Sequence, residues 1–207
     1  MKEPALPSAA LGSPGSFPEL LAQAGSSPAS EASLYARIPA EARHAIEAAT
    51  GYWELGMSVE TLREIRLLAG SPDPEVAAVA TEPHVQRFLL LAFMDLGLWA
   101  SALSVADALD AVARIEADFA DIPLKAAFCL HELGRTHDAR QRLYEAPAAA
   151  RDTALYHYDL ACYECRLGRL APATQHLAEA LRRDASLRSI LDEDANLAPI
   201  RHLVVKS

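Results

Sequence analysis

The chain has 207 residues, of which 51% are apolar and only 6% aromatic, and its formal net charge is −9 at pH 7. This length predicts one domain with a terminal extension, and the abundance of Ala, Leu, Arg and Glu favours helices that pack through small side chains. The acidic balance argues against nucleic acid as a partner, because phosphate binding needs a basic surface.

The compartment that the sequence favours is the cytoplasm. Glu3 follows Lys2, and Pro, Ser and Gly interrupt the next residues, so no secretory leader is expected. The longest strongly apolar run, residues 88–94, is too short to cross a bilayer. Three cysteines, an odd number, do not make a disulfide framework and fit a reducing compartment. Arg far outnumbers Lys, a bias that we interpret as that of a GC-rich, bacterial genome.

The first residues of the chain predict a flexible arm. Residues 1–31 are rich in Pro, Ser, Ala and Gly and contain one short apolar island, residues 17–21. Such a composition does not bury enough apolar surface to fold alone. Residues 32–207 then form the predicted helical domain, which begins with Pro39 in a first helical turn.

Apolar positions at helical spacing, separated by turn residues, predict four helical hairpins in this domain. We place them at about residues 40–70, 83–118, 122–147 and 152–184, followed by a closing segment at 186–207. Asp152 is positioned to cap the last hairpin. No alternating run rich in β-branched and aromatic residues argues for a sheet, so the expected fold class is all-α.

A Leu-Gly pair marks the turn of each hairpin. The turn glycines are Gly56, Gly97, Gly134 and Gly168, with spacings of 41, 37 and 34 residues. A small residue five positions after the glycine recurs as Ala102, Ala139 and Ala173, whereas the first hairpin has Thr61. A period of 34 residues with this pattern is typical of helix–turn–helix repeats, whose apolar faces are buried by stacking.

These residues resemble the tetratricopeptide repeat family. The match is strongest over residues 154–187, good around Gly134, fair around Gly97 and weak around Gly56. Residues 191–201 loosely resemble the acidic closing segment of bacterial members. The resemblance implies a right-handed α-solenoid of about four hairpins with a C-terminal capping segment, whose first helices line a concave groove.

In the family, groove residues lie ten, six, three and two positions before the turn glycine. Offsets of four, three and one keep such side chains on roughly one helical face. Carried onto this chain, the positions are Ile46, Thr50, Trp53 and Glu54; Arg87, Leu91, Met94 and Asp95; Leu124, Phe128, His131 and Glu132; and Tyr158, Cys162, Cys165 and Arg166.

The expected groove is an apolar stripe edged by both signs of charge. The stripe consists of Trp53, Leu91, Met94, Phe128 and Tyr158. Such a surface suits an apolar or amphipathic peptide or helix. The alternative is that these side chains pack the interior or hold the C-terminal segment. None of the positions is Lys or Asn, so the family's clamp for an acidic chaperone tail is not expected here.

The sequence contains little that predicts chemistry. Cys162 and Cys165 form a C-x-x-C pair, but in the second half of a helix, where tight packing explains them better than redox or zinc chemistry. His131 and Cys129 are the only plausible further zinc ligands, and two residues apart they point to different faces. No nucleophile elbow, phosphate loop or calcium loop occurs.

We therefore expect a non-enzymatic adaptor without metal or cofactor. Its partner would be another protein or peptide, its own N-terminal arm, or a second copy of the chain, with no nucleic acid and no membrane insertion. Self-association as a structural module is the alternative function, and a metal or thiol protein is a third.

Overall fold

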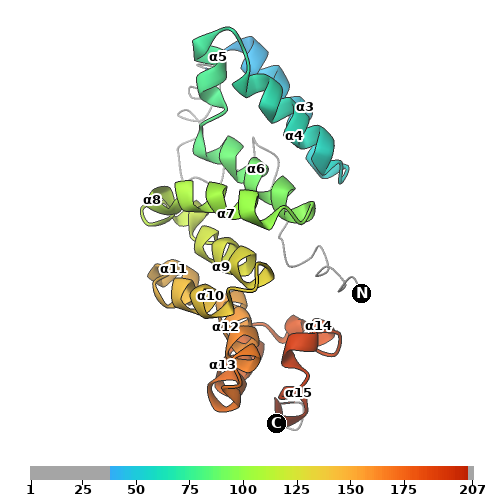
Figure 1. The fold of residues 1–207 in the computed structure, drawn as a ribbon, viewed down its shortest axis with the longest axis vertical. Coiled ribbons are helices and arrows are strands. Elements are labelled where there is room, and N and C mark those ends of the chain that lie inside the picture. The colour runs from blue at the N-terminus through green and yellow to red at the C-terminus, as the bar shows by residue number, and fades with distance from the viewer. Residues whose placement is uncertain (1–37, 205–207) are drawn as a thin grey trace. The chain divides into compact units, whose positions relative to one another are not determined.

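The computed structural model describes residues 38–204, over which the chain is helical and contains no β-strand. The predicted arm lies outside the described residues. Three antiparallel hairpins form, from α3 (Ala40–Glu54) and α4 (Ser58–Ala69), from α9 (Ile122–Glu132) and α10 (Thr136–Tyr144), and from α12 (Ala154–Arg166) and α13 (Leu170–Arg183) (Figure 1). A turn of the same kind joins α6 (Pro83–Asp95) to α7 (Trp99–Ala108).

Short helices occupy the connections. They are α5 (Pro74–Val79), α8 (Asp110–Ala113), η2 (Ala117–Phe119) and α11 (Ala148–Arg151). After α13 the chain continues through η3 (Ala185–Leu187), α14 (Arg188–Leu191), η4 (Ala195–Leu197) and α15 (Arg201–Val204). Contacts divide the chain inside α7, into residues up to Val105 and residues from Ala106.

The four turns between these helix pairs have the same geometry. Three residues separate the paired helices in each case, and the turn glycine lies in the left-handed region, with φ between 68° and 77°. The amide after the glycine donates to the carbonyl five residues earlier at 2.8 Å in each turn, as Arg169 does to Glu164. This bond and its left-handed glycine form a Schellman cap, which satisfies carbonyls that the helix leaves without partners.

The position five residues after each turn glycine is fully buried. Ala102, Ala139 and Ala173 have no exposed surface, and neither has Thr61 in the first hairpin. The Thr61 hydroxyl can donate to either of two carbonyl oxygens, that of Ala49 at 3.3 Å or that of Met57 at 3.1 Å. Because the buried hydroxyl has these partners, Thr replaces the usual Ala without leaving a polar atom unsatisfied.

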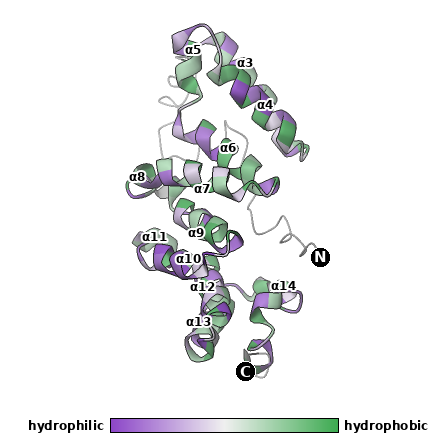
Figure 2. Ribbon diagram, viewed as in Figure 1, coloured by the Kyte–Doolittle hydropathy of each residue, from purple (hydrophilic) through white to green (hydrophobic). Residues whose placement is uncertain are grey.

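The first unit has one core, to which four helices contribute. Ile46 of α3, Ile65 of α4, Val76 of α5 and Phe88 of α6 are all buried in it, and Trp53 packs against its edge. Hydrophobic and hydrophilic residues mix along each helix (Figure 2), so the helices bury an apolar stripe and leave a polar one outside. At the turn ends, the Ser58 hydroxyl donates to Asp95 at 2.6 Å.

In the second unit a buried carboxylate lies where α10 meets α12. Glu164 has no exposed surface; it accepts from the Tyr144 hydroxyl at 2.8 Å and lies 2.8 Å from the Arg169 guanidinium. The guanidinium of Arg140 is 3.7 Å away. A buried carboxylate needs such partners, because desolvation disfavours an unpaired charge. Leu143 of α10 and Leu160 of α12 are also fully buried.

Candidate binding faces of the hairpins

The positions predicted to line a groove differ systematically in exposure. The residue two before each turn glycine is exposed and charged in all four helix pairs: Glu54, Asp95, Glu132 and Arg166. Four positions are half-buried: Trp53, Arg87, Phe128 and His131. The remaining eight are buried: Ile46, Thr50, Leu91, Met94, Leu124, Tyr158, Cys162 and Cys165. The aromatic and apolar surface open to a ligand is therefore smaller than the sequence predicts, because Leu91 and Met94 belong to the packing between helices.

Among the positions predicted to line a groove, Trp53 and Phe128 are the Phe, Tyr or Trp residues that keep exposed surface, one in each unit. Each comes shortly before an exposed carboxylate on its own helix, Glu54 or Glu132. His131, between Phe128 and the turn, has its Nδ1 3.0 Å from the Thr136 hydroxyl and its ring 5.0 Å from that of Tyr163. These contacts fix the imidazole at the end of α9.

The C-terminal segment contacts two of the predicted groove positions of α12. The Tyr158 hydroxyl donates to Oδ2 of Asp194 at 3.0 Å, and the Cys162 thiol lies 3.4 Å from the same oxygen. The other oxygen of Asp194 accepts the Asn196 amide at 2.8 Å and so caps η4. Leu197, with no exposed surface, follows. In the last hairpin, Tyr158 and Cys162 therefore hold the chain's own C-terminal segment, which is the alternative to a groove given above.

A second carboxyl on this side of α12 has an unusual protonation equilibrium. Burial raises the pKa of Asp159 to about 8; Lys125 opposes the rise in pKa, and Asp194 adds to it. Lys125 is itself buried and pairs with Asp121 at 2.8 Å. The raised pKa favours the protonated, uncharged form of Asp159 at neutral pH.

The three cysteines are free thiols in buried positions. Burial raises the pKa of Cys129 to about 12, and burial together with Asp194 raises the pKa of Cys162. Burial also raises the pKa of Cys165. The thiolate form is the one that attacks as a nucleophile and binds metal ions. The raised pKa values therefore disfavour both nucleophilic and metal-binding roles for these cysteines. No group of three or more His, Cys, Asp or Glu side chains suited to a metal ion occurs within residues 38–204.

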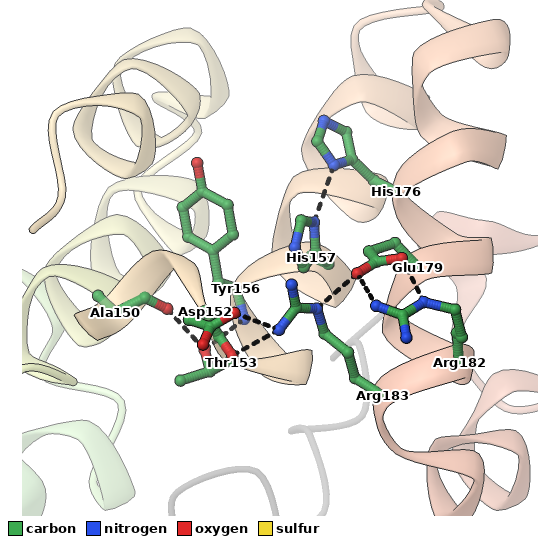
Figure 3. Close-up of polar contacts among 9 residues, drawn as sticks. All are labelled: Ala150, Asp152, Thr153, Tyr156, His157, His176, Glu179, Arg182 and Arg183. Carbon is green, nitrogen blue, oxygen red and sulfur yellow. Dashed lines mark hydrogen bonds and ion pairs between the residues drawn. The ribbon is translucent and has the colours of Figure 1, made fainter. Parts of the chain in front are cut away.

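Sequence reasoning missed a polar cluster between α12 and α13, which Figure 3 shows. His157 and His176 meet there, with their Nδ1 atoms 3.2 Å apart. The signal that could have found them is that they lie on opposite arms of one hairpin, His157 before Gly168 and His176 after it.

The cap of α12 also differs from the prediction. Thr153 accepts the Tyr156 amide at 3.2 Å and caps the helix. Asp152, the predicted cap, instead accepts from Arg183 of α13 at 2.5 Å. The prediction was wrong by one residue, because an ion pair across the hairpin takes the carboxylate.

Comparison with protein-family models, with curated proteins and with solved structures finds no match to this chain. The tetratricopeptide resemblance therefore rests on the residues quoted above. Within the described residues, no helix has the length and apolar character needed to cross a bilayer.

Proposed function

We propose that this protein is a non-enzymatic adaptor, built as a tetratricopeptide-like solenoid, that binds an apolar or amphipathic segment of another protein along the inner faces of its hairpins. The repeated three-residue turn with its Schellman cap supports the repeat architecture. The fully buried small-residue slot five positions after each glycine supports it too. Repeat folds of this kind present surfaces for binding rather than reaction centres.

One observation carries the binding proposal: in each unit an inner-face aromatic residue keeps exposed surface close to an exposed carboxylate. Trp53 precedes Glu54, and Phe128 precedes Glu132 by one helical turn. Aromatic side chains dominate binding energy at protein interfaces, and rim charges set orientation and encounter rate. The ligand that fits best is an amphipathic segment with apolar residues on one side and basic residues at its edge.

We also propose that the protein works in the cytoplasm of a bacterium. The three thiols are free, as a reducing compartment requires. The preference for Arg over Lys is the support for a bacterial source.

Site-specific photocrosslinking in cells tests the adaptor function. A photoreactive residue would replace Trp53 or Phe128, and matched controls would carry it at the exposed positions Arg63 of α4 and His137 of α10. The proposal expects the same partner to be crosslinked from positions 53 and 128 and not from the controls. Equal labelling from all four positions, or none from the two aromatic positions, contradicts it.

Self-association is a second candidate, and an exposed apolar patch in the first unit favours it. Leu55, Met57, Val59, Leu96 and Leu98 are 37–74% exposed at two turns, which the bond from Ser58 to Asp95 joins. Contiguous exposed apolar residues commonly mark interaction sites. Sedimentation of the wild type and of a Leu55→Ser, Val59→Ser variant tests this. A concentration-dependent dimer that the variant lacks supports self-association. A wild type that stays monomeric throughout a 100-fold dilution series starting at millimolar concentration contradicts it.

A further inference from the structure

His157 of α12 and His176 of α13 meet through the ends of their rings (Figure 3). The two Nδ1 atoms are 3.2 Å apart, the ring centroids are 5.5 Å apart, and the ring planes differ by 30°. A bond between two imidazole nitrogens requires that one carries a proton and donates while the other is unprotonated and accepts. The contact therefore exists only while at least one of the two Nδ1 atoms is free of a proton.

The charges around the pair come mainly from α13. Arg183 and Arg182 oppose protonation of His157, whereas Glu179 favours it. Glu179 is already engaged, however: its oxygens accept from Arg182 at 2.6 Å and from Arg183 at 2.7 Å. The carboxylate is thus neutralised by two guanidinium groups, and it offers a second histidine charge little compensation.

Other elements contribute little charge at the pair. On α12, Glu164 favours protonation of His176, but this carboxylate is paired with Arg169. On the remaining sides, Arg140 of α10 lies by Glu164, Lys125 of α9 and Asp194 of η4 act on Asp159, and Arg151 of α11 acts on Tyr156. Asp184 at the start of η3 binds Ser186, and Arg201 of α15 donates to the Asp192 carbonyl.

We propose that His157 and His176 form an acid-operated latch, which strengthens the packing of α12 against α13 while the pair shares one proton between its Nδ1 atoms and weakens it when both rings are protonated. The first added proton leaves an imidazolium that still donates to a neutral imidazole. The second leaves two donors, no acceptor and two positive charges at 3.2 Å. The contact between the two Nδ1 atoms then breaks.

The direction of the pH effect follows from the same pair. Burial lowers the pKa of both histidines, and for His157 the second cause is His176. Below the ordinary histidine pKa of about 6.5, the open hairpin therefore binds more protons than the closed hairpin. The contact stabilises the closed hairpin fully above about pH 6.5. This stabilisation is lost as the pH falls from about 6.5 through the lowered pKa values of the two histidines.

Hydrogen exchange of the full chain, corrected for intrinsic rates, tests the latch between pH 7.5 and 5. In the wild type we expect opening of residues 154–183 to become more frequent by up to about tenfold per pH unit below pH 6.5, relative to α3 and α4. A variant with His157→Gln and His176→Gln should lose this slope, and His137→Gln, at an exposed histidine of α10, should keep it. A slope that persists in the double variant, or that is absent from the wild type, overturns the proposal.

A double-mutant cycle removes the possibility that the variants merely weaken the fold. The coupling between His157→Gln and His176→Gln should be favourable at pH 7.5 and absent or unfavourable at pH 5, because the cycle isolates the pairwise contact. If the variants are too unstable to measure, imidazole NMR titration of the wild type replaces the cycle. Two separated steps below the ordinary histidine range support the latch; two independent steps at the ordinary value, or a coupling that is equal at both pH values, overturn it.

Discussion

Replacing Asp194 with Ala should release the C-terminal segment from α12. The carboxylate holds this segment in two ways: one oxygen accepts from Tyr158 and Cys162 of α12, and the other caps η4 through the Asn196 amide. Ala provides neither contact. The Tyr158 side chain is only 4% exposed, so in a closed structure its hydroxyl would be left without a partner.

The expected loss is about 3 kcal/mol. A hydrogen bond to a charged acceptor contributes about 2 kcal/mol when its partner is buried, and an N-cap contributes about 1 kcal/mol. Because 1.4 kcal/mol is a factor of ten, local opening of the segment should become about 100-fold more frequent. The pKa of Asp159 should also fall from about 8, since Asp194 is one of the groups that raise it.

Hydrogen exchange over residues 191–204 and carboxyl NMR of Asp159 measure these effects. Asp192→Ala is the matched control, because Asp192 is exposed in the same segment and contributes its carbonyl, not its side chain, to the contact with Arg201. Equal exchange in Asp194→Ala and in the control would refute the role given to Asp194. Exchange that rises in the first unit as well would show general unfolding rather than release.

Three further outcomes follow from the structure. Gly168→Ala should lower the free energy of unfolding by about 1–2 kcal/mol in urea denaturation, because φ there is 73°. Gly51→Ala inside α3, where a Cβ meets nothing within 4 Å, should raise it by about 0.5–1 kcal/mol. A change of the same sign in both variants would contradict this. Glu164→Gln should cost about 2 kcal/mol in the same assay, less than a fully enclosed pair because its Arg169 partner is half exposed. Cys129 and Cys162 should react with a thiol reagent at pH 8 only as fast as the protein opens, since burial raises the pKa of both; fast alkylation of the folded protein would contradict this.

The turns were predictable from the sequence because a single residue type decides them. A left-handed backbone position favours Gly over every other residue, and the apolar periodicity on either side defines the two helices. The positions of Gly56, Gly97, Gly134 and Gly168 therefore locate all four turns. Thr61 weakened the match of the first hairpin in sequence, yet it occupies the same buried slot as the alanines, because backbone carbonyls accept its hydroxyl proton.

The candidate binding face was less predictable, because exposure depends on what each helix meets. Offsets from the glycine place Leu91 and Met94 on the expected face, but neighbouring helices bury both. Tyr158 and Cys162 lie beneath a segment more than thirty residues further along the chain, a distance over which periodicity carries no information. Within one hairpin, the meeting of two histidines depends on side-chain length and rotamer as well as on spacing.

The most direct test of the adaptor proposal is the affinity of the chain for the segment that crosslinking identifies. Fluorescence anisotropy should show that Phe128→Ala weakens binding by at least about tenfold, as truncation of an interface aromatic commonly does, while His137→Ala leaves the affinity unchanged and both variants keep the wild-type melting temperature within a few degrees. An unchanged affinity for Phe128→Ala would contradict the claim that the inner faces of the hairpins bind the partner.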